Sequence, residues 1–236
     1  MIIPAYNTIY SRVNTSGAAG PFEYTAIDNN YSMEFDGTSD SVTTGHAESG
    51  DITLSAWINC NGTYPNFQPR YPLSITPSHS SLPNGTIGRI YKRTTNQFYV
   101  MIQGYDETGA NFDNYFPVFN FEGAGWKHCV WTFNNTTKAI YFYLDGIAQD
   151  WTKNTGFTTH PFITMPGYSY ASLLKIGTRA SSYFFGGKVD EVAVWGTVLS
   201  EGTIEAIYNT TIDNPGKVAD LSETPEGAHT AWYRFE

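Results

Sequence analysis

The chain has 236 residues, of which 41% are hydrophobic and 16% aromatic. This content of large apolar side chains supports a buried core and excludes a wholly disordered protein. Only 15% of the residues are charged, and the net charge is −9. An acidic surface repels the phosphate backbone of nucleic acids and anionic lipid headgroups, so we expect neither nucleic-acid binding nor membrane insertion.

The N-terminus shows no basic region followed by an apolar stretch, so no signal peptide is visible. No apolar run approaches the ~20 residues that span a bilayer. The two cysteines, Cys60 and Cys129, each lie in a strand-like run. We expect two buried free thiols, although the spacing leaves a bridge between neighbouring strands open.

The first 30 residues differ from the rest of the chain. They contain few charges, a run of small residues at 16–21 and no sustained hydrophobic period. Residues 1–30 are therefore predicted to form an extended N-terminal arm, of the kind that is ordered only when it docks on something.

Alternation of apolar and polar residues begins at Tyr31 and predicts a series of strands. The strongest signal is a hairpin, in which the run 125–133 turns and returns along 139–144. The stretch 61–85 contains five prolines and is predicted as a loop that is functional or packs on a partner. The other predicted strands are 31–37, 51–58, 97–102, 173–177 and 187–195.

One helix is predicted from residue 201, with Ser200 as its N-cap and a short apolar stripe on one face. The run 231–235 predicts a last strand. Many short strands without alternating helices indicate an all-β fold, a two-sheet antiparallel jelly-roll sandwich with one short C-terminal helix. We assign the sandwich to residues 31–209 and a C-terminal tail with the final strand to residues 211–236.

Five segments in order resemble the laminin-G-like, concanavalin-A-like jelly rolls of the lectin and glucanase type. They are MEFDG at 33–37, LSAWI at 54–58, WKH at 126–128, YFYLDG at 141–146 and FGGKVDEVAVW at 185–195. The resemblance covers about residues 31–209. Similar domains occur in phage and other virion proteins, often with sequences of low charge, and there a segment like 220–235 commonly follows the domain.

A calcium site is one expectation from these residues. In the predicted strand 187–195 Asp190 shares a face with Val192 and Val194, and a carboxylate on an apolar face must be paired or bind a cation. The resemblance implies a structural Ca²⁺ between the closing strand and the first one, held by Asp190, Asp36 and backbone carbonyls near Gly37. The alternative is that Asp190 accepts backbone N–H bonds at a strand crossing.

The same fold class includes endoglucanases, which need two facing carboxyl groups. Asp190 and Glu191 are adjacent, so on a regular strand they point to opposite faces and cannot flank one bond. The sequence also lacks a Gly-x-Ser-x-Gly elbow, a His-Glu-x-x-His motif and a P-loop. His128 alternates with apolar neighbours and is expected to be a core residue. We therefore expect no enzymatic activity.

Sugar binding is the remaining site chemistry, because lectin sites stack a sugar ring on an aromatic face and anchor its hydroxyls with polar side chains. The candidates are Trp57, together with Tyr183, Phe184 and Arg179 from a later loop. The alternative is that Trp57 belongs to the core and that Tyr183 and Phe184 only pack the loop.

Two non-enzymatic functions remain. The favoured one is a structural, decorating or fibre component of a larger assembly, a virion or extracellular surface, with other protein subunits as partners. It rests on the flanking segments, the low charge and the proline-rich stretch. The second is a lectin-like adhesion module that binds surface glycans, which rests on the fold alone. A glycoside hydrolase is the least favoured.

Overall fold

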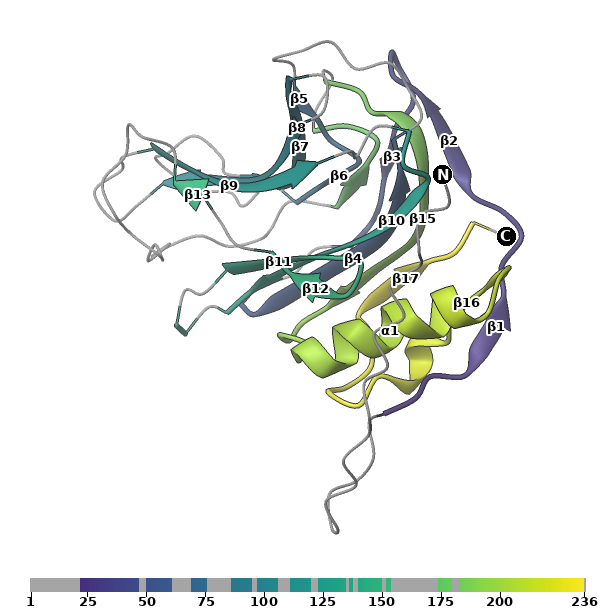
Figure 1. The fold of residues 1–236 in the computed structure, drawn as a ribbon. Coiled ribbons are helices and arrows are strands. Elements are labelled where there is room, and N and C mark those ends of the chain that lie inside the picture. Colours follow the sequence, from purple (N-terminus) through teal and green to yellow (C-terminus); the bar gives the residue numbers. More distant parts are fainter. Residues whose placement is uncertain are drawn as a thin grey trace, which may run out of the picture.

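The computed structural model describes residues 22–46, 50–60, 69–75, 86–94, 97–105, 111–119, 123–134, 136–137, 140–149, 152–153, 174–179 and 183–235. These residues form three layers (Figure 1). A main antiparallel sheet lies in the middle, smaller sheets face it on one side, and a helix with the C-terminal segment covers its other side. The predicted all-β antiparallel sandwich with one helix is confirmed.

The main sheet is centred on β4, residues Ile52–Asn59, which pairs with a long strand on each side. The strand order is β12-β11-β10-β4-β15-β17, and β2 also pairs with β15. The bounds are β2 Met33–Asp36, β10 Trp126–Phe133, β11 Ile140–Leu144, β12 Ile147–Ala148, β15 Gly186–Trp195 and β17 Ala231–Tyr233. The predicted central hairpin is therefore confirmed as β10 and β11.

The facing layer contains two smaller sheets. One has the order β13-β9-β8-β7-β5 and the other β3-β14-β6. Their bounds are β3 Val42–Thr43, β5 Pro69–Arg70, β6 Leu73–Ser74, β7 Thr86–Thr94, β8 Gln97–Tyr105, β9 Asn111–Phe119, β13 Thr152–Lys153 and β14 Lys175–Ile176.

The prediction of a continuous loop at 61–85 is wrong for residues 69–75, while 61–68 and 76–85 lie outside the described residues. β5 pairs with β7 at the end of its sheet, where a proline is tolerated because no neighbour needs its missing N–H. Tyr71, Leu73 and Ile75 are buried. This short segment therefore contributes to the core, although it is rich in proline.

β4 is buried on both faces, and this places it between two cores. Ile52, Leu54, Ala56 and Ile58 alternate toward the smaller sheets and belong to the inner core. The inner core contains the buried residues of β4, β10 and β15 on that face, together with Leu73, Leu174 and Ile176. Cys60 and Cys129 lie here as free, buried cysteines, which confirms the prediction of two free thiols.

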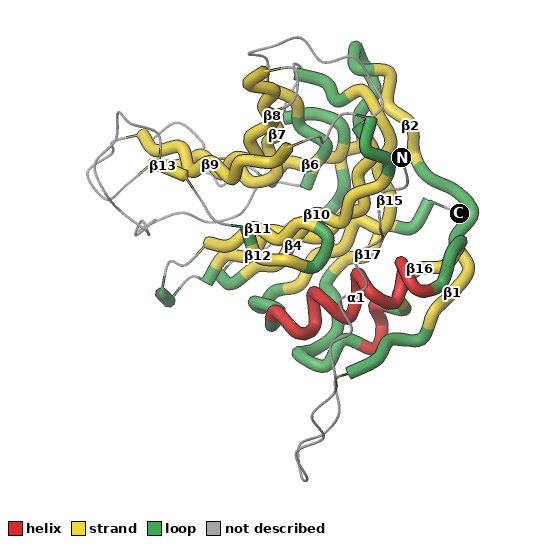
Figure 2. Tube along the Cα trace, in the orientation of Figure 1, coloured by secondary structure: helices red, strands yellow, loops and turns green. Residues whose placement is uncertain are grey.

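The second core lies between the main sheet and the C-terminal segment, and we call it the outer core. Trp195, Leu199, Ile204, Ile207 and Leu221 are among its buried residues. The layer is built from α1 Glu201–Asp213, β16 Lys217–Ala219, the short helix Leu221–Glu223 and β1 Ala26–Asp28 (Figure 2). The helix and the tail thus belong to the body of the fold.

The part of the predicted N-terminal arm that the structure describes docks on its own chain. β1 pairs with β16 in antiparallel register. Tyr24 is buried, and its hydroxyl donates to the Oγ1 of Thr224 over 3.2 Å. Residues 22–30 therefore pack against the C-terminal segment of the same chain, while residues 1–21 lie outside the described residues.

The N-terminus of α1 has the predicted Ser200 cap and a second acceptor from the tail. The backbone N–H of Thr203 donates to Ser200 Oγ over 3.2 Å. Glu226 accepts from the backbone N–H of Ser200 at 3.1 Å and from its hydroxyl at 2.6 Å, and it also accepts from the Thr203 hydroxyl. The carboxylate therefore connects the tail to the first turn of the helix.

We expect Glu226→Ala to lower the free energy of unfolding by about 1–2 kcal/mol, because the first turn of α1 loses an acceptor from the tail. Glu205→Ala on the exposed face of the same helix is the matched control and should change stability by less than about 0.5 kcal/mol. Urea denaturation measures both. Equal effects of the two substitutions would contradict the role assigned to Glu226.

Candidate functional site

The closing strand β15 is interrupted by a bulge, and this changes where the acidic residues lie. Its register with β4 shifts between Asp190 and Ala193, and Glu191 has a φ of 50°, in the left-handed region. Val189 and Val192 consequently both face the inner core. The prediction that Asp190 shares a face with Val192 is wrong, because the bulge inserts an extra residue into the alternation.

The prediction that Asp190 and Glu191 point to opposite faces is wrong for the same reason. The side-chain amide of Asn29 donates to Asp190 Oδ2 over 2.8 Å and to Glu191 Oε1 over 3.1 Å. Both acidic residues are buried, with relative exposures of 5% and 3%. Two adjacent carboxylates thus converge on one amide nitrogen.

The tail covers these two carboxylates. Trp232 donates its indole N–H to Glu191 Oε2 over 2.6 Å, and the Nε of Arg234 donates to Glu191 Oε1 over 3.3 Å. Burial raises the pKa of Glu191 to about 7, and the negative charge of Asp190 adds to the shift. Burial also raises the pKa of Asp190. A substrate has no access to this pair while the tail is docked.

The predicted calcium ligands are not brought together. Asp36 pairs in register with Gly186, and Asp190 lies four residues further along β15. At ~3.3 Å per residue this separates them by ~13 Å, far beyond the reach of one ion with ligands at ~2.3–2.6 Å. The calcium ion predicted between Asp36, Gly37 and Asp190 does not fit this structure.

The oxygens of Asp36 are also already engaged. They accept from the backbone N–H groups of Thr38, Ser39 and Asp40 at 2.8, 2.8 and 3.1 Å, and from the hydroxyls of Thr38 and Ser39. The Thr38 hydroxyl and these N–H groups hold the pKa of Asp36 well below its usual range. Asp36 therefore closes the turn that contains Gly37, whose φ is 76°.

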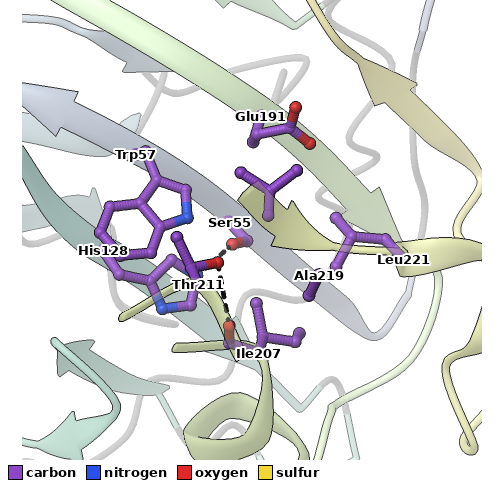
Figure 3. Close-up of a pocket in the computed structure, with 9 residues that line it drawn as sticks. Ser55, Trp57, His128, Glu191, Ile207, Thr211, Ala219 and Leu221 are labelled. Atoms are coloured by element: carbon purple, nitrogen blue, oxygen red, sulfur yellow. Dashed lines mark hydrogen bonds between the residues drawn. The ribbon is translucent and has the colours of Figure 1, made fainter. Parts of the chain in front are cut away.

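Trp57, a predicted sugar platform, lies on the outer face of β4 and is covered by α1. Its relative exposure is 6%. Its ring stacks on His128, with centroids 5.1 Å apart, and on Tyr208 of α1, with centroids 6.0 Å apart. Figure 3 shows the Trp57 and His128 rings side by side in the wall of a small cavity. Trp57 is thus a core residue, the alternative that the sequence left open.

A serine–histidine contact in this cavity was not predicted from the sequence. Ser55 Oγ lies 2.9 Å from His128 Nε2, on paired strands. Among the described residues, His128 Nδ1 has no hydrogen-bond partner, and burial lowers the pKa of His128 to about 3. Within the part of the chain that the structure describes, no carboxylate orients the imidazole, and the side chains of Ser55 and His128 are both buried. The contact does not meet the requirements of an accessible nucleophile.

Two of the other predicted sugar-binding residues, Arg179 and Tyr183, come together on the ring of Tyr71, and Phe184 follows Tyr183 in the chain. The guanidinium of Arg179 lies over the ring of Tyr71, 5.9 Å from its centroid. The ring of Tyr183 lies 6.1 Å from that of Tyr71. Tyr71 is fully buried, Tyr183 is 46% exposed, and Arg179 and Phe184 are partly exposed. We call Tyr71, Arg179, Tyr183 and Phe184 the aromatic loop cluster.

Strand ends hold the aromatic loop cluster in place. The N–H of Gly177 donates to Pro72 O over 2.9 Å, and the hydroxyl of Ser74 donates to Thr178 O over 2.8 Å. On the other side of the cluster, Phe185 N donates to Gly177 O over 2.8 Å. Arg179 and Tyr183 both lie in the connection between β14 and β15, and the two described ends of this connection are thereby bonded to each other and to Pro72 and Ser74.

The backbone of Tyr183 is strained. Its φ is 61°, in the left-handed region, which costs a residue other than glycine about 1–3 kcal/mol. A strained backbone conformation persists only where the surrounding structure holds it, and such residues concentrate at functional sites. Sequence reasoning identified Tyr183 but missed Tyr71, which it assigned to the proline-rich loop.

Two further properties apply to the described part of the chain. No group of three or more His, Cys, Asp and Glu side chains within it is arranged to hold a metal ion. The helices among these residues are too short or too polar to cross a membrane.

Several solved structures share this fold at low sequence identity. A heptameric SAP-like pentraxin from Limulus polyphemus has 12% identity and a TM-score of 0.55, covering 86% of this chain and 91% of that one. A putative carbohydrate binding protein from Bacteroides ovatus has 14% identity and a TM-score of 0.52, covering 91% and 52%. The enzymatically active domain of tailspike protein 2 from bacteriophage CBA120 has 11% identity and a TM-score of 0.59, covering 94% and 34%.

This chain therefore spans about half of the Bacteroides protein and a third of the tailspike domain. No curated protein matches its sequence. A family model matches residues 36–205, which run from the last residue of β2 to the start of α1 and include β4, β10, β11 and β15. The chain belongs to the concanavalin A-like lectin/glucanases superfamily.

Proposed function

We propose that this chain is a non-enzymatic recognition module of a larger assembly and that it binds carbohydrate at the aromatic loop cluster. The observation that carries the proposal is the exposed ring of Tyr183 in a strained backbone, together with the guanidinium of Arg179, both packed on the ring of Tyr71. An exposed aromatic face stacks on the C–H face of a sugar ring, and a guanidinium donates hydrogen bonds to its oxygens.

The non-enzymatic part of the proposal is supported by the position of the paired acids. Asp190 and Glu191 bond to the same Asn29 amide and are covered by residues 232–235. A glycoside hydrolase needs two carboxyl groups that flank an accessible bond. In this arrangement the acidic side chains hold the tail, and a sugar chain cannot reach them.

A glycan array with the full chain tests the proposal. We expect binding by the wild type and at least a tenfold loss in Tyr183→Gly, which removes the ring and relieves the strain, because glycine adopts a positive φ freely. Tyr31→Gly removes a tyrosine that is 67% exposed in another segment and serves as the matched control. An array without hits at high protein concentration, or equal binding by Tyr183→Gly, would overturn the proposal.

The assembly in which the module acts is the second part of the proposal, and a virion surface is the candidate. Support comes from the fold of the phage tailspike domain, where the similar region is about a third of a longer chain, and from the heptameric pentraxin. We expect the chain to co-sediment with intact particles and to be labelled by antibodies on their surface. A chain that is found only free of particles would contradict a virion role.

A further inference from the structure

Charge is unevenly divided between the two layers that cover the main sheet (Figure 1). The strands of the facing layer contain six basic residues and one acidic residue, namely Arg70, Arg89, Lys92, Arg93, Lys153 and Lys175 against Asp113. On the helix side, β1, α1, β16 and the short helix contain one basic residue and five acidic residues, namely Lys217 against Asp28, Glu201, Glu205, Asp213 and Glu223. The facing layer is therefore basic in a chain whose net charge is −9.

The aromatic loop cluster belongs to the basic layer. Tyr71 lies between β5 and β6, and Arg179 follows β14, which pairs with β6. The described segments that carry the cluster up to the start of β15 are 69–75, 174–179 and 183–185. Their charged residues are Arg70, Lys175 and Arg179, and these segments contain no Asp or Glu. The segments that build the cluster thus contribute only positive charge.

Two acidic residues lie in a turn that packs against the same connection. A Cβ built on Gly177 would contact the backbone oxygen of Asp40. Asp40 Oδ2 accepts from the backbone N–H of Asp36 over 3.0 Å, and Asp36 accepts from the backbone N–H groups of residues 38–40. Both carboxylates therefore bond to the backbone of their own turn, whereas the guanidinium of Arg179 lies on the ring of Tyr71.

The acidic residues of the helix side have little influence on an anion at the cluster. They lie across the main sheet from the facing layer, and packed sheets are already about 10 Å apart. The Debye length is ~8 Å at physiological ionic strength, so the field of exposed charges is largely screened over this separation. The nearby positive charges consequently determine which ligand charge the cluster favours.

We infer that the aromatic loop cluster selects acidic glycans, whose sugars carry a carboxylate or a sulfate, and that Arg179 determines this specificity. The inference rests on the proposed glycan binding and names its substrate class. Arg179 and the exposed ring of Tyr183 both pack on the ring of Tyr71. Tyr183 provides the stacking face, and the guanidinium pairs with the anionic group. Its charge-assisted, bidentate hydrogen bonds are roughly twice as strong as those to a neutral hydroxyl.

A glycan array of neutral, carboxylated and sulfated glycans, probed with the full chain, is the first test. The best acidic hit is then compared with its neutral counterpart, made by carboxyl reduction or by desulfation, and calorimetry measures both affinities. We expect the wild type to bind the acidic form at least about tenfold more tightly, because the neutral form loses the charge-assisted bonds.

Substitutions identify the residue responsible. Arg179→Gln should reduce the preference for the acidic form to about twofold or less, and Arg179→Lys, which keeps the charge but not the planar fork, should retain an intermediate preference. Lys217→Gln removes the same charge on the helix side and is the matched control, so its preference should stay within about twofold of the wild type. Tyr183→Gly should weaken the binding of both forms.

The outcomes separate this inference from the proposed function. Hits confined to neutral glycans, or a wild-type preference smaller than tenfold, overturn the inference and leave glycan binding intact, whereas an array without hits overturns both. An unchanged preference in Arg179→Gln, or an equal loss in Lys217→Gln, overturns the role of Arg179. If Arg179→Gln does not fold, the wild-type comparison of the acidic form with its neutral counterpart decides on its own.

Discussion

Gly187→Ala is expected to destabilise the protein by about 3–5 kcal/mol, the sum of overpacking and an unfavourable backbone conformation. Gly187 lies in β15 with a φ of 149°, and a Cβ built there would overlap the carbonyl oxygen of Asn59 in β4. That oxygen belongs to the neighbouring strand of the main sheet, so neither strand can move aside without breaking the ladder. Urea denaturation measures the loss directly.

A second glycine provides the control for this substitution. Gly202 lies in α1 with open space around the position of its missing Cβ. Gly202→Ala should raise stability by up to about 1 kcal/mol, because alanine loses less conformational entropy in a helix. Destabilisation of equal size by both substitutions would show that the close approach of β15 to β4 is not the cause.

Trp57→Ala is expected to cost about 3–5 kcal/mol and to lower the melting temperature by roughly 10 °C. The substitution leaves a cavity between His128 and Tyr208, in the layer that joins the main sheet to α1. Under native conditions glycan binding should persist, because the ring faces the helix. Thermal unfolding and the glycan array together measure both consequences.

Trp126→Ala is the matched tryptophan control for this prediction. Trp126 lies on the adjacent strand β10 and is 38% exposed, so it buries less apolar surface than Trp57 does. Its removal should therefore cost clearly less stability than the removal of Trp57. A stable Trp57→Ala protein that no longer binds glycan would contradict the assignment of Trp57 to the core.

The central hairpin, the edge strand β2 and the Ser200 cap could be predicted from the sequence, because each follows a local rule. β10 and β11 are two runs rich in apolar and aromatic residues on either side of a turn, in which Asn134 Oδ1 accepts from Thr136 N over 3.0 Å and Thr137 N over 2.7 Å. Ser200 is followed by a short apolar stripe, and the helix begins at Glu201.

The errors in the prediction come from features that alternation does not encode. The bulge at Glu191 reverses which face Asp190 occupies, and the sequence contains no glycine that would signal it. The proline-rich stretch conceals Tyr71, whose burial under Arg179 and Tyr183 completes the aromatic loop cluster. The bulge at Glu191 and the burial of Tyr71 both depend on contacts between residues that are far apart in the sequence.

The burial of Trp57 beneath α1 also depends on a contact between segments that are far apart in the sequence. Its strand alone indicates a large aromatic ring on one face of a sheet, which suits a binding platform and a core equally. Tyr208 lies about 150 residues later in the chain and is the residue that stacks on the ring. Only the packing of α1 over this ring shows that Trp57 is a core residue and not a binding platform.

Oxidative footprinting of the aromatic side chains, with and without the best glycan from the array, tests the central claim most directly. We expect Tyr183 and Phe184 to be modified in the free protein and protected when the glycan binds, while Trp57 stays unmodified in both states. Modification of Trp57 that the glycan suppresses, with no change at Tyr183, would place recognition on the outer face of β4 and contradict the account.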